Sequence, residues 1–119
     1  MKKPKHELSA TEINTLRKFY RVLSQFHDMS KRFPVSYMEG LLHIAFKQGL
    51  GTKELSERMG VGKDDASRIL GAIGHRARRD ADAFGLVEQE TDLYDSRMTH
   101  YYLTPKGFHL LKRIAADLE

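Results

Sequence analysis

The stretch "TKELSERMGVGKDDASRIL" (residues 52–70) decides how this chain is expected to fold. Apolar residues recur at helical spacing in both halves of it, at Leu55, Met59, Ala66, Ile69 and Leu70. The "GVG" between the halves favours a tight turn, and Thr52 is placed to cap the first helix. The pattern therefore predicts a helix-turn-helix, which we expect to cover 52–83 with an extended second helix.

The second helix of this pair is expected to have one apolar and one polar face. On a helical wheel the polar face carries Asp64, Ser67, Arg68, Gly71, His75, Arg78 and Arg79. Gly71 and Gly74 have two interpretations. They either allow another backbone to approach closely or mark a break into a separate short helix.

The flanking segments complete one domain over 9–119, preceded by a basic tail at 1–8 that we expect to be mobile. Ser9 and Glu12 have the spacing of a capping box, and Thr104-Pro105 is a typical helix start. The expected elements are a helix over 9–32, a helix within 33–49, the helix-turn-helix, a two-stranded wing over 86–104 and a helix over 105–119. This order predicts a mainly α fold with a small β-ribbon, a winged helix-turn-helix.

Apolar spacing also predicts which side chains are buried in the flanking helices. In the second helix these are Met38, Leu41, Leu42, Ala45 and Phe46. In the last helix they are Phe108, Leu111, Ile114 or Ala115, and Leu118.

Composition sets limits on the class of protein. The 119 residues carry a formal charge of +4 and no cysteine, which excludes disulfides and thiolate metal sites. We expect a cytoplasmic protein, because the N-terminus lacks a signal-peptide pattern and no apolar run approaches the roughly 18 residues of a membrane helix. The charge permits a nucleic-acid partner, although most of the surplus lies in 1–33, with eight Lys and Arg against three acids.

A winged helix-turn-helix suits double-stranded DNA, because the major groove admits a helix and a β-ribbon fits beside it. The stretches "KELSERMGVGKDDASRIL", "GLVEQETD" and "DSRMTHYYLTPKGFHLL" resemble the MarR family of winged-helix transcription regulators over about 34–115. The resemblance implies a homodimer on a palindromic operator, with the second helix of the pair in the major groove and Arg97 of the wing in the minor groove.

The sequence departs from the family pattern in three places. The recognition helix opens with Asp64-Asp65 where the family has Ser/Thr-type residues. The path from Ser67-Arg68 to the first wing strand is about eight residues longer, or ~12 Å as helix. The family also has a further C-terminal helix that helps to form the dimer, whereas this sequence ends at Glu119.

These features give a set of candidate DNA contacts. Lys63, Ser67 and Arg68 are expected at base edges or nearby phosphates, and Thr52, Arg76, Arg78 and Arg79 at the DNA backbone. The alternative interpretation of the basic run 75–80 is a charged surface that is exposed to solvent and contacts no DNA. Asp64 stabilises the helix start and has the spacing for an ion pair with Arg68, and it could also accept from cytosine N4.

The expected dimer contacts lie on the first and last helices, at Ile13, Leu16, Tyr20, Leu23, Leu111 and Leu118. The alternative is that this stripe belongs to the core of a single chain.

No residue pattern indicates an enzyme, a metal site or a cofactor, and none specifies a pocket for a small-molecule effector. The rival function is a protein–protein adaptor that keeps the winged-helix shape without reading DNA. It is favoured by the aspartate pair and by an acidic wing with Glu88, Glu90, Asp92 and Asp95 against Arg97.

Overall fold

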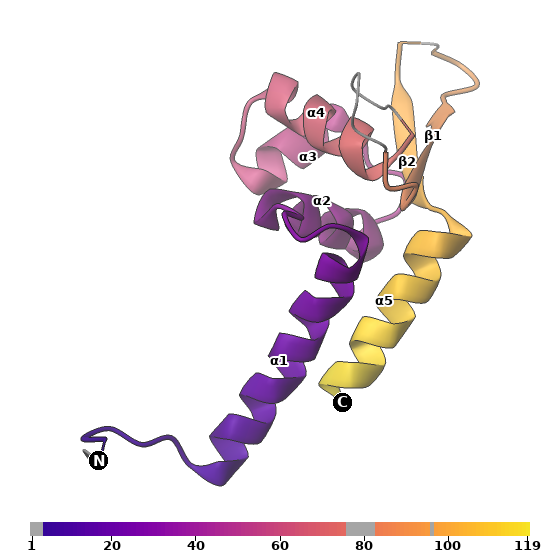
Figure 1. Ribbon diagram of the computed structural model, residues 1–119. Coiled ribbons are helices and arrows are strands. Elements are labelled where there is room, and N and C mark those ends of the chain that lie inside the picture. Colours follow the sequence, from indigo (N-terminus) through magenta and orange to yellow (C-terminus); the bar gives the residue numbers. More distant parts are fainter. Residues whose placement is uncertain (1–3, 76–82, 96) are drawn as a thin grey trace.

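A computed structural model describes residues 4–75, 83–95 and 97–119 (Figure 1). Its elements are α1 (Ala10–Met29), α2 (Val35–Phe46), α3 (Thr52–Met59), α4 (Lys63–Ile73), β1 (Val87–Thr91), β2 (Thr99–Leu103) and α5 (Pro105–Leu118). This order confirms the predicted winged helix-turn-helix, mainly α with a small β-ribbon.

Figure 1 divides the molecule into two parts. Helices α1 and α5 lie side by side and run in opposite directions, and we call this pair the stalk. Helices α2, α3 and α4 together with the β-hairpin form the head at one end of the stalk. The hairpin projects beyond the helices as the wing.

Both stalk helices begin at the caps that the sequence predicts. The Ser9 hydroxyl accepts from the Glu12 backbone N–H at 3.0 Å, and the Glu12 carboxylate accepts from the Ser9 N–H at 2.8 Å. The Thr104 hydroxyl accepts from the Gly107 N–H and donates to the Gly85 carbonyl. This last bond ties the start of α5 to the chain entering the wing.

The wing is an antiparallel pair with Val87 opposite Leu103 and Thr91 opposite Thr99. Its second strand is also bound to the loop between α2 and α3, because the Gly49 N–H donates to the Tyr101 carbonyl and the Tyr101 N–H to the Leu50 carbonyl. The base of the wing is thus attached to the helix-turn-helix by backbone hydrogen bonds.

The core lies mainly in the head. Its fully buried large side chains are Leu41, Ile44, Leu50, Leu55, Ile69, Leu70, Ile73, Leu86 and Val87. In the turn between α3 and α4, Gly60 has a φ of 69°, a left-handed conformation that glycine adopts without strain. The turn thereby brings Ala66 and Ile69 of α4 onto the same core as Leu55 of α3.

The predicted buried faces of α2 and α5 are partly wrong. Leu42, Phe46, Phe108 and Leu118 are exposed, whereas Ile44 and Leu110 are buried. On α2 the reason is Gly40, where a Cβ atom would lie 2.7 Å from Ile69 Cγ2. The bare glycine lets α4 come close, and this contact turns Met38, Leu41 and Ile44 inward.

The second helix was predicted to extend to residue 83. This prediction is wrong from residue 74 onward in the described chain, because α4 ends at Ile73 with Gly74 as its cap. The carbonyls of Ala72, Ile73 and Gly74 accept from the backbone N–H groups of Phe84, Leu86 and Gly85. A continuing helix would need those carbonyls for its own next turn, so the returning chain replaces it.

Thr52 is also not the cap of α3. Gly51 occupies that position, and Thr52 is the first residue of the helix.

Candidate nucleic-acid interface

The outer face of α4 is polar and open to solvent. Lys63, Asp64 and Arg68 are exposed there and Ser67 is half-buried, while Ala66 and Ile69 on the other side are buried. The helical wheel placed Gly71 on the outer face as well, but Gly71 is buried in the head. The predicted recognition surface is therefore confined to the first two turns of the helix.

Arg68 is held by an aspartate, though not by the predicted one. Its Nη2 lies 3.3 Å from Asp65 Oδ1, three residues earlier, rather than pairing with Asp64. Both side chains are substantially exposed, so such a pair contributes only ~0–1 kcal/mol to stability. Asp64 stays exposed in the first turn, where the helix dipole favours an acid and Gly62 provides no side-chain cap.

A second group of charges lies at α3. Glu54 is 2.7 Å from Lys47 Nζ and 3.3 Å from Arg58 Nη2, and the hydrogen bond from Lys47 is the main reason that the pKa of Glu54 is lowered. Sequence spacing could have found the Glu54–Arg58 pair, which is an i,i+4 pair on one helix. It could not have found Lys47, which comes from the end of α2. Thr52, two residues before Glu54 on the same helix, is half-buried.

The wing arginine is also paired within the protein. Asp95 accepts from the Arg97 backbone N–H at 3.0 Å and from Nε and Nη2 of its guanidinium at 3.1 and 3.2 Å. These hydrogen bonds lower the pKa of the Asp95 carboxyl. The arginine side chain remains 88 % exposed, so a phosphate or base edge can still reach it.

His100 connects the turn of the wing to the head, which the sequence did not indicate. Its Nδ1 lies 2.8 Å from the Gly49 carbonyl oxygen and its Nε2 lies 3.0 Å from Asp92 Oδ2. Both partners are acceptors, so both ring nitrogens must carry hydrogen for the two bonds to form together. The bond to Asp92 and then the bond to Gly49 raise the pKa of His100.

Three predicted backbone contacts, Arg76, Arg78 and Arg79, lie outside the described residues. The described residues on either side of them are joined by backbone hydrogen bonds, from Phe84 to Ala72 and from Gly85 to Gly74. His75, the last described residue before it, is exposed.

The stalk carries several exposed large apolar side chains, which we call the apolar row. Among the predicted dimer contacts, Ile13, Leu16, Tyr20 and Leu118 are exposed. Phe19 and Phe108 enlarge this row, whereas Leu23 and Leu111 are half-buried against the chain's own core. Large apolar side chains are thus exposed along both stalk helices.

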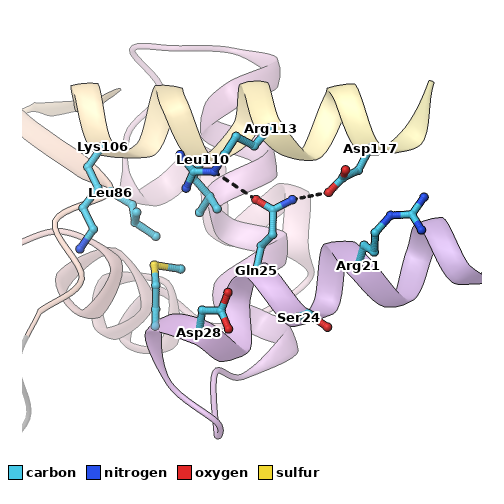
Figure 2. Close-up of a pocket in the computed structure, with 10 residues that line it drawn as sticks. Arg21, Ser24, Gln25, Asp28, Leu86, Lys106, Leu110, Arg113 and Asp117 are labelled. Atoms are coloured by element: carbon cyan, nitrogen blue, oxygen red, sulfur yellow. Dashed lines mark hydrogen bonds between the residues drawn. The ribbon is translucent and has the colours of Figure 1, made fainter.

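A pocket of about 460 Å³ lies between the two stalk helices (Figure 2). Gln25 lies between Asp117, to which its amide nitrogen donates, and Arg113, whose Nε lies 3.4 Å from the amide oxygen. Arg21 and Lys106 also line the pocket. Its volume is in the range of small-molecule sites, a feature that no sequence pattern had indicated.

Two further observations concern the part of the chain that the structure describes. It contains no group of three or more His, Asp or Glu side chains placed to hold a metal ion. None of its helices combines the length and apolar character that crossing a membrane requires.

No family model matches the chain, and no curated protein matches it in sequence. Solved structures match it by fold. MepR of S. aureus, solved in complex with DNA, is 16% identical with a TM-score of 0.67, and the match covers 90% of this chain and 77% of MepR. The PcaV transcriptional regulator of Streptomyces coelicolor is 18% identical with a TM-score of 0.60, covering 92% and 76%. A MarR-like transcriptional regulator of Thermotoga maritima is 20% identical with a TM-score of 0.59, covering 93% and 76%. The chain therefore has a MarR-like winged-helix fold.

Proposed function

We propose that this protein is a homodimer that binds double-stranded DNA sequence-specifically and regulates transcription. The observation that carries the proposal is the exposed polar face of α4 beside a projecting wing, both in the head (Figure 1). The proposal includes no catalysis, no cofactor and no effector. It keeps the cytoplasmic location expected from the sequence.

The similar folds support the proposal. MepR, which has this fold, has been solved in complex with DNA, and PcaV is a transcriptional regulator. A helix of the length of α4 fits the major groove, and a β-hairpin beside it can reach the adjacent minor groove.

The proposed contacts divide into base readers and backbone contacts. Lys63, Ser67 and Arg68 on α4 read base edges, with Asp65 holding the arginine in place before DNA arrives. Asp64 accepts from a cytosine N4 group where the site offers one. Thr52 at the start of α3 faces a phosphate, together with the three arginines at 76, 78 and 79.

Arg97 enters the minor groove from the wing. It must first leave Asp95, as Arg68 must loosen its contact with Asp65. Exposed ion pairs of this kind are weak, so exchanging the carboxylate for DNA costs at most about 1 kcal/mol each.

The second protomer covers the apolar row of the stalk. A two-fold axis there places the two α4 helices on successive major grooves, roughly 34–36 Å apart along the DNA. The proposed site is therefore palindromic.

A salt titration of DNA binding tests the proposal most directly. Fluorescence anisotropy with a mixed-sequence duplex should show binding at low ionic strength that falls steeply with salt, because phosphate contacts release counterions. Selection of duplexes from a random pool should then yield a palindrome. Absence of binding to any duplex at low salt would refute DNA binding.

Arg68→Ala tests the base-reading role of α4. On the selected site it should weaken binding by about 1–3 kcal/mol and relax the preference at one position in each half-site. Arg32→Ala, which removes the same charge from the exposed turn between α1 and α2, is the matched control. If Arg68→Ala weakened binding equally on all DNA sequences, Arg68 would contribute only charge attraction and would not read a base.

The adaptor function remains a second candidate, because the two arginines expected to reach bases, Arg68 and Arg97, are both paired with aspartates of the same chain. The salt titration separates the two functions. An adaptor would bind no duplex at low salt, and its polar α4 face would instead be free for a protein partner.

A further inference from the structure

The crest of the wing carries two adjacent apolar side chains. Leu93 and Tyr94 are 93% and 97% exposed, the highest values among the large apolar residues that the structure describes. Single exposed apolar residues are common on protein surfaces, but two neighbours at the end of a projecting hairpin form a contact surface.

Hydrogen bonds fix the backbone beneath this crest. Asp92 Oδ1 accepts from the N–H groups of Tyr94 and Asp95 at 2.8 and 3.1 Å. The Asp92 N–H donates to the Met98 carbonyl, and the Met98 N–H donates to the Asp95 carbonyl. The bond from His100 then anchors Asp92 to the head. The two apolar side chains are therefore presented from an ordered turn.

The acids next to the crest each have a hydrogen-bonding partner within the wing. Asp92 lies 3.0 Å from His100 Nε2, and Asp95 lies 3.1 Å from Arg97 Nε. Of the other two acids of the wing, Glu88 lies near the base of β1, whereas Glu90 lies near the end of the strand, opposite His100. The carboxylates of Asp92 and Asp95 are thus hydrogen-bonded within the wing, and the exposed guanidinium of Arg97 lies beside the two apolar side chains of the crest.

We propose that Leu93 and Tyr94 are minor-groove contacts that pack against the sugar walls of DNA beside the α4 half-site. The inference rests on the proposed DNA-binding function and deepens it. The minor groove is about 6 Å wide and its walls are sugars, and DNA-binding proteins place apolar side chains there to contact sugars or to open base steps. On this view the wing binds through apolar contact as well as through Arg97.

The double variant Leu93→Ser/Tyr94→Ser tests the inference on the duplex selected with the wild-type chain. Its affinity should fall about tenfold or more, because two apolar side chains lose their burial. The slope of log affinity against log salt should stay unchanged, since no charge is removed. Arg97→Ala should by contrast make that slope shallower.

Hydroxyl-radical footprinting gives a second readout, because the radicals attack sugars from the minor groove. The wild-type chain should protect sugars flanking each half-site, and the double variant should lose that protection at a protein concentration that saturates the site. Val35→Ser, at an exposed apolar residue at the start of α2, is the control and should behave as wild type. Urea unfolding of all variants establishes that the head stays folded, which is expected because both substituted side chains are exposed.

The outcomes are distinguishable. A double variant with wild-type affinity and an unchanged footprint would overturn the inference alone; the crest would then be free in the complex and available to a protein partner. A wild-type chain that binds no duplex would overturn the proposed function and this inference with it.

Discussion

The head and the stalk differ in where their apolar side chains lie. Every fully buried large side chain belongs to the head, whereas the stalk leaves Leu16, Phe19 and Tyr20 on its surface. The core of the head is thus complete within one chain. In the proposed dimer the partner covers these exposed side chains, so the stability of the stalk should depend on protein concentration.

The largest expected effect is on the head. Ile69→Ala removes a side chain that is 1% exposed and fits into the space left by Gly40. The loss of burial and the resulting cavity should lower the free energy of unfolding by about 2–5 kcal/mol, measured by urea unfolding with circular dichroism.

Ile13→Ala is the matched control, because it makes the same change in the exposed row of the stalk. In dilute protein it should cost much less than Ile69→Ala. If the two variants lost the same free energy of unfolding, the contrast between a buried core in the head and an exposed apolar row on the stalk would be contradicted.

The next effect is on assembly. Leu16→Glu places a charge in the proposed dimer contact and removes a leucine whose burial is worth about 1.5–3 kcal/mol in each protomer. The dissociation constant of the dimer should therefore rise at least roughly 100-fold. Sedimentation equilibrium measures this, while circular dichroism should show an intact head.

Leu93→Glu makes the same change at an exposed leucine of the wing and should leave the dimer intact. A Leu16→Glu chain that sediments like wild type would show that the stalk row is not the dimer contact.

A smaller effect is expected at the start of the stalk. Ser9→Ala removes one half of the capping box and should cost about 1 kcal/mol, with a range of roughly 0.5–2. The loss should be visible as faster amide exchange in the first turn of α1. Ser24→Ala, in the interior of the same helix, should be nearly neutral because alanine is the better helix former. If Ser24→Ala matched Ser9→Ala, the loss would come from something other than the cap.

The smallest expected effect concerns the joint between wing and head. The folded pKa of His100 lies above its usual value of 6.5, so its bonds to Asp92 and Gly49 contribute fully below about pH 6.5. That contribution is lost as the pH rises through the raised value. The pKa of Asp92 is lowered, mainly by His100, so acid removes the contribution only below the usual carboxyl pKa of 3.8.

NMR titration of the His100 ring should therefore give a pKa above 6.5 in the wild-type chain and a lower one in Asp92→Asn. The amide protons of Tyr94 and Asp95, which Asp92 binds, should exchange faster in that variant. If the His100 pKa were the same in both chains, Asp92 would not be the group that raises it.

The sequence predicted local features better than contacts between elements. The capping box at Ser9, the Thr104-Pro105 start and the turn after α3 are set by residues a few positions apart, and all three are present. Leu42 and Phe46 were assigned to the wrong face because a wheel carries no information about Gly40, whose close contact with α4 sets the rotation of α2. The predicted pair of Arg68 with Asp64 is wrong for a different reason, because both aspartates lie within reach along the helix and the structure pairs Arg68 with Asp65.

By itself the sequence determined the order of the elements and the fold class, because caps, turns and apolar spacing act over a few residues. Only the tertiary structure decided where α4 ends, since the chain that returns at Phe84 takes the carbonyls that a longer helix would need. It also decided that Asp92 at the tip of the wing is paired, because the hairpin brings His100 beside Asp92 and against Gly49. These outcomes depend on contacts between groups that are separated in sequence, and such groups come close to each other only when the chain folds.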